Sequence, residues 1–313
     1  MSSPTQTLLA PSLKNILFAT DFSPCSQAAI PYMCAIAEAY GSTIHVVHVL
    51  APEPMLELPL DMSPELDADR DVAQSMLKAL LAGKPFGNIP STATAVRGPL
   101  WDVLAASIEE KSIDLIVLGT HGRHGLKKFV LGSIAEQVFR LARCPVLTVG
   151  PQATNEGVVN GSFGTILFAT DFSFGSQDAL PYAVSLARAN NSRLVLVHAV
   201  TSSMELVPAG FGNLASAPVE VSPEFIAEAL AVARQQLEEL VPEETILGLK
   251  HEAIVERGPA AKTILEVAKN KQASLIVMGA HRASVNSIVS HLPWATASTV
   301  VCRAHCPVLT VRS

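Results

Sequence analysis

The chain has 313 residues, of which 49% are apolar and 16% charged, and its formal net charge is −6. This length favours two domains, and the apolar content is enough for a large core, which argues against intrinsic disorder. The acidic balance argues against a nucleic-acid-binding surface. Five cysteines without a CxxC motif or regular spacing are typical of reduced thiols in a cytoplasmic protein.

The N-terminal residues 1–12 are interpreted as a tail. This segment has no basic region and only a short apolar stretch, so it lacks the features of a signal peptide. No apolar run in the chain approaches the length of a membrane span. We therefore expect a cytoplasmic protein that has neither membrane nor nucleic acid as a partner.

The chain contains a long internal repeat. The octapeptide Ile-Leu-Phe-Ala-Thr-Asp-Phe-Ser occurs at residues 16–23 and again at 166–173, and the hexapeptide Cys-Pro-Val-Leu-Thr-Val occurs at 144–149 and 306–311. The offset grows from 150 to 162 residues, so the second copy carries short insertions. A period of this length indicates a duplicated domain rather than a solenoid. We expect domains at 13–150 and 163–313, joined by a polar linker at 151–162.

Strands and helices alternate along each copy. In the first copy the patterns predict strands at 15–20, 43–49, 92–96, 114–118 and 146–149. Helices are expected to begin after Ser23, at Ser63, at Pro99 and at Gly132-Ser133, with Gly41 ending the first. Pro31 lies inside the first helix and predicts a kink or a later start. This alternation predicts an α/β fold with two tandem, open, doubly wound parallel sheets that carry helices on both faces.

A glycine-bearing stretch follows the fourth predicted strand, and its residues are Gly119, Gly122, Gly132 and Ser133. Glycine allows close approach of the backbone, and a helix that begins at Gly132-Ser133 points N–H groups at an anion. Ser133 is expected to cap this helix or to bind a phosphate oxygen. Asp21 and Val49 lie at two other strand ends, where the ligands of such sheets bind. The alternatives are a glycine-rich turn without a ligand, and an Asp21 that only caps the first helix.

The spacing Gly119-x2-Gly122-x9-Gly132-Ser133, with the repeated first and last strands, resembles the ATP-binding universal stress proteins over nearly the whole chain. The resemblance implies a Rossmann-like fold of the adenine nucleotide alpha hydrolase type, with five-stranded sheets. It also implies that domains pair through their last strands, within one chain for tandem members. The implied nucleotide-binding residues are Ala19, Asp21 and Val49 for adenine and ribose, and Gly119, Gly122, Gly132, Ser133 and Ile134 for ribose and phosphates. Arg123, Lys127 and Lys128 would add positive charge near the phosphates.

The second copy departs from this pattern. Arg282 replaces Gly122, Leu292-Pro293 replaces Gly132-Ser133, and Ala199 replaces Val49, whereas Asp171 is retained. Proline removes a backbone donor, and leucine lacks the conformational freedom of glycine. We therefore predict that domain 2 does not bind ATP in the family's manner and serves as a structural partner. The alternative for domain 2 is that Arg282 binds a different anion.

Other polar residues have simpler interpretations. His48 and His198 occupy matching places in apolar strands and are expected to be core histidines with satisfied hydrogen bonds. A metal site needs more converging ligands than the remaining histidines and cysteines offer, so neither a metal site nor a disulfide is predicted. These residues are His121, His124, Cys144, Cys302 and Cys306. The two tryptophans, Trp101 and Trp294, are expected to pack.

The chain contains no GxxxxGK[ST], GxSxG or HExxH motif. Nothing in the sequence would activate water against a γ-phosphate or supply the usual Mg²⁺ ligands, so binding is better supported than rapid hydrolysis, and no catalytic residue is assigned. The first hypothesis is one ATP per chain, or ADP or AMP, held in domain 1 as a ligand that stabilises one conformation or assembly during stress. The alternatives are an interaction protein that binds no nucleotide, and a slow ATPase. A homodimer is left open.

Overall fold

The computed structural model describes residues 10–52, 63–120, 132–153, 158–159, 161–201, 222–280 and 291–312, without the side chains of 63–67, 158–159, 243–244 and 291–294. The first half contains β1 (Asn15–Ala19), α1 (Pro24–Tyr40), β2 (Thr43–Leu50), α2 (Ser63–Leu81), β3 (Ser91–Arg97), α3 (Leu100–Glu110), β4 (Leu115–Gly119), α4 (Ser133–Leu141) and β5 (Val146–Val149). After the short β6 (Val158–Val159) and β7 (Ser162–Phe163), the second half contains β8 (Thr165–Ala169), α5 (Phe174–Ala189), β9 (Arg193–Val200), α6 (Pro223–Glu239), α7 (Glu243–Ile246), β10 (His251–Arg257), α8 (Ala260–Asn270), β11 (Leu275–Gly279), α9 (His291–Arg303) and β12 (Val308–Val311).

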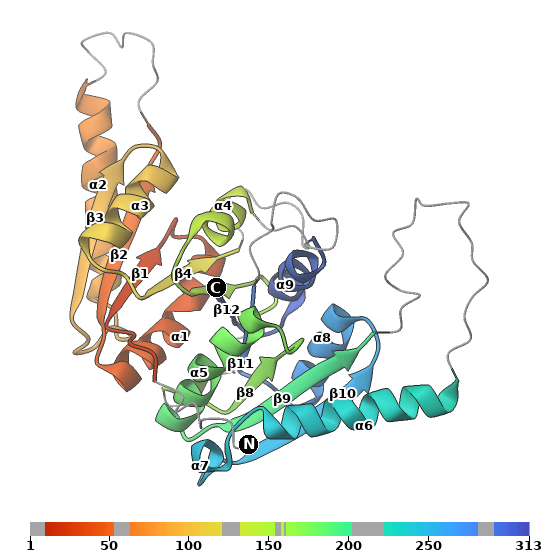
Figure 1. The fold of residues 1–313 in the computed structure, drawn as a ribbon. Helices are drawn as coiled ribbons and strands as arrows, with labels where there is room; N and C mark the ends of the chain where they lie inside the picture. The colour runs from red at the N-terminus through yellow and green to blue at the C-terminus, as the bar shows by residue number, and fades with distance from the viewer. Residues whose placement is uncertain are drawn as a thin grey trace, which may run out of the picture.

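The strands of both halves form one continuous 10-stranded sheet in the order β10-β9-β8-β11-β12-β5-β4-β1-β2-β3 (Figure 1). Strands within each half are parallel, and the halves meet where β12 lies antiparallel to β5, with Leu309 opposite Leu147. The predicted pairing of the two repeated hexapeptide strands is therefore confirmed. Thr148 Oγ1 donates to Val308 O (3.1 Å) and Thr310 Oγ1 donates to Val146 O (3.2 Å). These reciprocal bonds are what a pseudo-two-fold axis between the halves produces.

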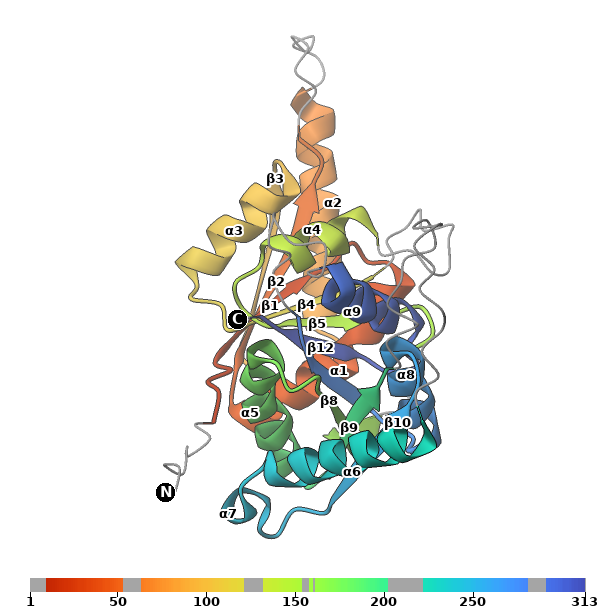
Figure 2. The ribbon, with the colours of Figure 1, turned by 45° about the vertical axis from the view of Figure 1, so that its right-hand side comes forward.

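Helices cover both faces of the sheet, which confirms the predicted α/β class. The core on one face includes α1, α2, α5 and α6, and the core on the other includes α3, α4, α8 and α9. Figure 2 shows α6 lying along the second half, beside β9 and β10. Because both faces are covered, the central strands have no polar side, and Ile16, Leu17 and Phe18 are all fully buried. No helix in the described part of the chain is both long and apolar enough to cross a membrane.

Local signals set the ends of α1. The Ser23 side chain caps the helix by accepting the N–H of Ser26, and Pro24 occupies the first turn. Gly41 ends the helix with φ of 61°, a left-handed conformation that glycine adopts without strain. The helix begins at Pro24 and continues through Pro31, so the later start that proline suggested does not occur.

Two features were not predicted from the sequence. β6 and β7 form an antiparallel hairpin across the end of the predicted linker, with Val159 opposite Ser162. The short helix α7 lies between α6 and β10. Neither feature has the long apolar period that identifies the main elements, so sequence patterns alone did not reveal them.

Candidate functional site

The carboxyl ends of β4, β1 and β2 lie side by side and bring four of the predicted site residues together at the carboxyl-terminal end of these strands. Ala19, the last residue of β1, pairs with Val47 of β2 and with Leu118 of β4. Asp21 and Gly119 therefore lie just beyond this row, and Val49 lies on the neighbouring strand. The chain leaves β1 towards α1 on one face and leaves β4 towards α4 on the other. This change of direction makes a switch point, the usual ligand position in such sheets.

The turn from β1 to α1 holds the Asp21 side chain in place. Asp21 Oδ1 accepts the N–H of Ser23 (2.9 Å), and the N–H of Phe22 donates to Thr20 Oγ1 (3.0 Å). Phe22 has φ of 60°, a left-handed conformation that is unusual for a bulky residue. Burial by itself raises the pKa of Asp21, but hydrogen bonds from Ser23 and Ser26 outweigh it and hold the pKa below its ordinary value. Asp21 is therefore an ionised group with a structural role at the start of α1.

The second half contains the same turn. Ser173 N–H donates to Asp171 Oδ1 (3.0 Å), and Phe172 has φ of 62°. Phe172 N–H donates to Thr170 Oγ1 (2.9 Å), as in the first half. The turn therefore forms whether or not the glycine-bearing loop is present, and the capping interpretation of Asp21 has direct support.

The two histidines on β2 and β9 each form one hydrogen bond, through Nδ1, to the turn that follows the neighbouring strand. His48 Nδ1 lies 2.7 Å from Thr20 O, and its ring lies 4.7 Å from that of Phe22. A carbonyl oxygen only accepts, so Nδ1 carries the proton. His198 repeats the arrangement, with Nδ1 2.8 Å from Thr170 O. Both rings lie near the carboxyl ends of their strands and are half-buried.

The loop after β4 is closed at its base. Thr120 N–H donates to Val149 O (2.9 Å), and Gly132 N–H donates to Thr120 O (3.0 Å). Gly122, with the basic residues predicted near the phosphates, lies outside the described residues, and the same holds for His121 and His124.

The two described glycines of this loop are explained by close packing. A Cβ on Gly119 would lie 2.8 Å from Cys25 C and Ser26 N, and a Cβ on Gly132 would lie 2.7 Å from Thr120 O. Gly279 in the second half would clash in the same way, at 2.3 Å from a backbone oxygen of α5. Glycine is therefore needed at these positions to let the backbone segments approach, independently of any ligand.

Helix α4 begins where the resemblance puts the phosphates. Gly132 is its N-cap and makes no side-chain cap bond, so Ser133 is the first helical residue and not the cap. Ser133 is exposed, and Ile134 is 44% exposed. The first N–H groups of a helix have no partner within it, and the helix dipole favours negative charge there. The start of α4 is thus suited to an anion.

The corresponding helix of the second half begins earlier. The last residues of the two helices, Leu141 of α4 and Arg303 of α9, are 162 residues apart, which is also the offset between β5 and β12. The helices differ in length, because α4 has 9 residues and α9 has 13. Counted from these ends, Trp294 and Ala295 occupy the places of Gly132 and Ser133, inside the helix. Counted from β11, Leu292 and Pro293 occupy them. Neither alignment gives the second half a helix that starts with Gly-Ser.

The candidate metal ligands and cysteines among the described residues do not form a cluster. No group of three or more His, Cys, Asp or Glu side chains in this part of the chain could hold a metal. All five cysteines are free thiols. Burial raises the pKa of Cys306 to about 12 and that of Cys144 to about 11, so both are protonated near neutral pH. Trp101 packs against the core on the α3 and α4 face, as expected of a packing tryptophan.

Comparison with known proteins gives consistent matches to one family. The model of the universal stress protein family matches residues 12–150 and 162–312. A universal stress protein of Mycolicibacterium smegmatis is 26% identical over 305 residues, covering 95% of this chain and 96% of that protein. One from Methanocaldococcus jannaschii is 31% identical over 138 residues, which is 44% of this chain and 81% of that protein. The crystal structure of a universal stress protein from Archaeoglobus fulgidus superposes with a TM-score of 0.67 at 21% identity, covering 95% of this chain and 98% of that one.

Proposed function

The chain belongs to the universal stress protein family, and on that premise we propose that its first half binds one ATP at the edge formed by β4, β1, β2 and the start of α4. The observation that carries the proposal is the switch point. Asp21, Val49 and Gly119 reach one edge from three adjacent strands, and α4 begins with exposed Ser133 beside them. We propose bounds of 13–150 for this domain, with a linker at 151–162 and a second domain at 163–313.

The residues present fit an adenine nucleotide. The ionised Asp21 carboxylate has several lone-pair positions and can accept from a ribose hydroxyl or the adenine amino group while it holds Ser23. The backbone of Val49 would face the adenine edge, with Ala19 lining the site. The N–H groups of Ser133 and Ile134 would bind phosphate, together with the loop from Gly119 through Gly122 to Gly132.

The nucleotide would act as a ligand and not as a substrate. No group of three or more His, Cys, Asp or Glu side chains among the described residues would hold a metal by itself, so any Mg²⁺ that accompanies the nucleotide would be held mainly by its phosphates. A ligand that binds only the folded state stabilises it by about 2.7 kcal/mol at a hundred times its Kd. Such energy is enough to favour one conformation or assembly, and ADP or AMP would act through the same contacts. The proposal locates the protein in the cytoplasm, which suits five free thiols.

One observation favours a second candidate, an interaction protein that binds no nucleotide. Asp21, Gly119 and Gly132 each have a structural role that needs no ligand. The two candidates differ in the role of Ser133. Its side chain is exposed and forms no hydrogen bond with the described residues, so it has no structural role there that would replace phosphate binding.

The test begins with the purified chain. Denaturation followed by chromatography measures the bound adenine nucleotide, and calorimetry measures ATP affinity. We expect about one nucleotide per chain. About two would contradict an inactive second half, and none, with no binding on titration, would favour the interaction protein. Turnover clearly above the buffer rate would instead indicate a slow ATPase.

Variants separate binding from folding. Asp21→Asn should weaken ATP binding about tenfold or more through loss of a charged hydrogen bond. Asp171→Asn is the matched control, because it alters the same turn in the second half and should leave ATP affinity unchanged. Ser133→Glu should also weaken ATP binding while it favours the helix dipole of α4 and keeps the fold. Gly132→Leu is a poor test, since the added side chain would strike Thr120 O.

A further inference from the structure

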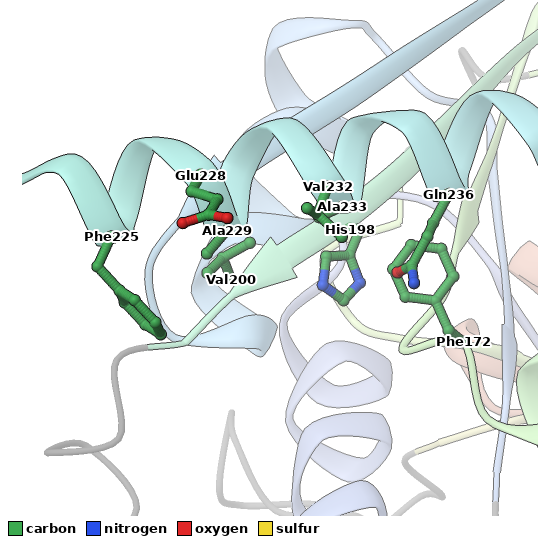
Figure 3. A pocket seen from close by; sticks show the side chains of 9 residues that line it. All are labelled: Phe172, His198, Val200, Phe225, Glu228, Ala229, Val232, Ala233 and Gln236. Atoms are coloured by element: carbon green, nitrogen blue, oxygen red, sulfur yellow. The ribbon is translucent and has the colours of Figure 1, made fainter.

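A cavity of about 390 Å³ lies in the second half, between the carboxyl end of β9, the turn from β8 to α5, and α6 (Figure 3). Its volume is within the range of small-molecule sites. Phe172 comes from the turn, His198 and Val200 come from β9, and Phe225, Glu228 and Gln236 come from α6.

This cavity is separate from the proposed nucleotide edge. Leu194 and Leu196 of β9 point to the face that carries α5 and α6, and Val195 and Val197 point to the opposite face. By this alternation His198 and Val200 continue on the α6 face, whereas Ala199, the counterpart of Val49, does not. The cavity also lies in the half whose helix α9 starts without Gly-Ser.

The walls of the cavity are suited to a flat ring. The rings of Phe172 and His198 pack 4.4 Å apart, and Val200 and Ala229 add apolar surface. Phe225 is 63% exposed and Val232 is 50% exposed, so apolar side chains at the rim remain in contact with water. A planar ligand would cover this surface and stack on the rings.

The polar groups of the cavity are mainly acceptors. His198 Nδ1 donates to Thr170 O (2.8 Å), so Nε2 of the neutral ring keeps a lone pair. The Glu228 carboxylate only accepts when ionised, and the Gln236 amide offers one acceptor beside its donors. A ligand that carries N–H donors matches this set.

Glu228 has no ion pair among the described residues. Arg234 on the same helix pairs with Glu238 (3.1 Å). Arg257 lies beside Val200 in the register of β9 and β10 and forms no ion pair with Glu228. The sequence between β9 and α6, residues 202–221, contains no Lys, Arg or His. The cavity therefore presents negative charge, which a cationic ligand would neutralise.

We propose that this cavity binds a small planar aromatic molecule that carries a positively charged nitrogen donor, such as an amidine or a protonated aromatic amine. The ring packs against His198 and Phe172, and the cationic group donates to the Glu228 carboxylate. Charge-assisted hydrogen bonds of this type are stronger than neutral ones, so Glu228 selects the cation.

The test uses benzamidine as the probe and benzamide as its neutral counterpart, each titrated into the full chain by calorimetry and ligand-observed NMR. Benzamidine should bind at least about tenfold more tightly than benzamide. Glu228→Gln should remove this preference by weakening benzamidine about tenfold. Glu239→Gln, a charge removal on the same helix away from the cavity, should leave both affinities unchanged. Both glutamates are exposed, so neither variant threatens the fold.

Three results would overturn the proposal. The first is an absence of benzamidine binding at millimolar concentration. The second is equal affinity of benzamidine for the wild type and Glu228→Gln. The third is competition by ATP, which would place the probe at the other edge of the molecule. Binding that persists in saturating ATP and is lost with Glu228→Gln supports it.

Discussion

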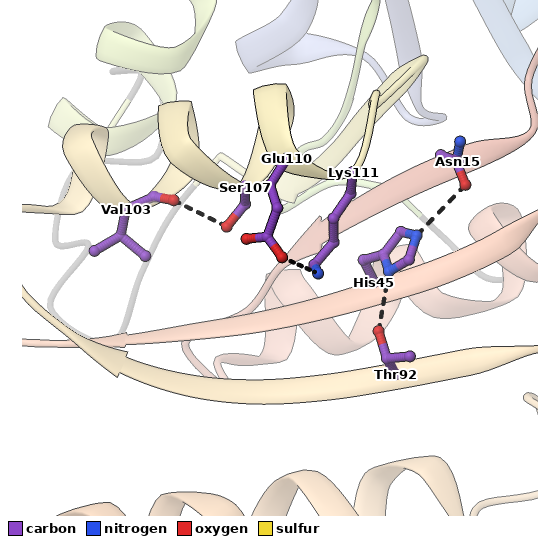
Figure 4. Close-up of polar contacts among 7 residues, drawn as sticks. All are labelled: Asn15, His45, Thr92, Val103, Ser107, Glu110 and Lys111. Carbon is purple, nitrogen blue, oxygen red and sulfur yellow. Dashed lines mark hydrogen bonds and ion pairs between the residues drawn. The ribbon is translucent and has the colours of Figure 1, made fainter.

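His45 lies near the start of β2, at the end of the sheet away from the candidate site. Figure 4 shows its ring between Asn15 and Thr92. Its Nδ1 is 2.9 Å from Thr92 Oγ1, and its Nε2 is 3.5 Å from Asn15 Oδ1. Since the Asn15 oxygen only accepts, Nε2 donates and Nδ1 of the neutral ring accepts from the Thr92 hydroxyl. Burial lowers the pKa of His45, the charge of Lys111 lowers it further, and Glu110 opposes both.

This lowered pKa makes the free energy of unfolding depend on pH, as does the pKa of His305, which burial also lowers. Below the ordinary histidine value of 6.5, unfolded His45 takes up a proton that the folded ring does not yet bind. The free energy of unfolding should therefore fall as the pH drops from 7.5 to 5.5, and His45→Gln should reduce that slope. Urea denaturation at several pH values measures it. His251→Gln, at an exposed histidine, is the control, and an unchanged slope in His45→Gln would contradict the assignment.

At the scale of elements, the packing of β4 against the start of α1 depends on Gly119. Gly119→Ala would place a methyl group 2.8 Å from backbone atoms of Cys25 and Ser26, which cannot move as a flexible side chain does. We expect a loss of about 1–3 kcal/mol in the free energy of unfolding, from overpacking. Gly164→Ala is the matched control, because nothing lies within 4 Å of its added Cβ and the change should cost much less. Equal stability of the two variants in urea would show that the backbone relaxes there.

The elements themselves were largely predictable because their signals are local. The buried apolar runs fixed the main strands of the first half to within about two residues, and Ser23, Pro24 and Gly41 marked the ends of α1. The glycines were harder to interpret. Sequence spacing suggested ligand approach at Gly119, whereas its contact with α1 depends on tertiary packing that spacing does not encode.

The site and the cavity show the same limit. Ser133 was expected either to cap α4 or to bind a phosphate oxygen, and the first alternative is wrong because Gly132 is the N-cap. The cavity beside α6 needs the placement of a helix against a strand end, which no single segment specifies. Its signal in the sequence was indirect: His48 and His198 occupy matching places in the two copies, and the sequence suggested only a core role for them.

At the scale of the whole molecule, each half closes the open edge of the other. Val146, Leu147 and Val149 of β5 are buried, and β12 supplies the backbone partners of this strand on the side away from β4. An apolar strand with unpaired backbone groups is a strong site for association. The duplication therefore gives the chain an internal partner at an edge that would otherwise bind a second copy. Any homodimer of the full chain would use a different surface.

This arrangement predicts the behaviour of an isolated first half. A fragment of residues 10–153 should form a dimer in which β5 pairs antiparallel with its own copy, as β5 pairs with β12 in the full chain. Sedimentation equilibrium at tens of micromolar measures this association. Leu147→Lys would put a charge into the buried seam and should return the fragment to a monomer, whereas Lys14→Gln, at an exposed residue just before β1, should leave the dimer intact. A fragment that stays folded and monomeric would mean that helix packing, rather than the strand seam, holds the halves together.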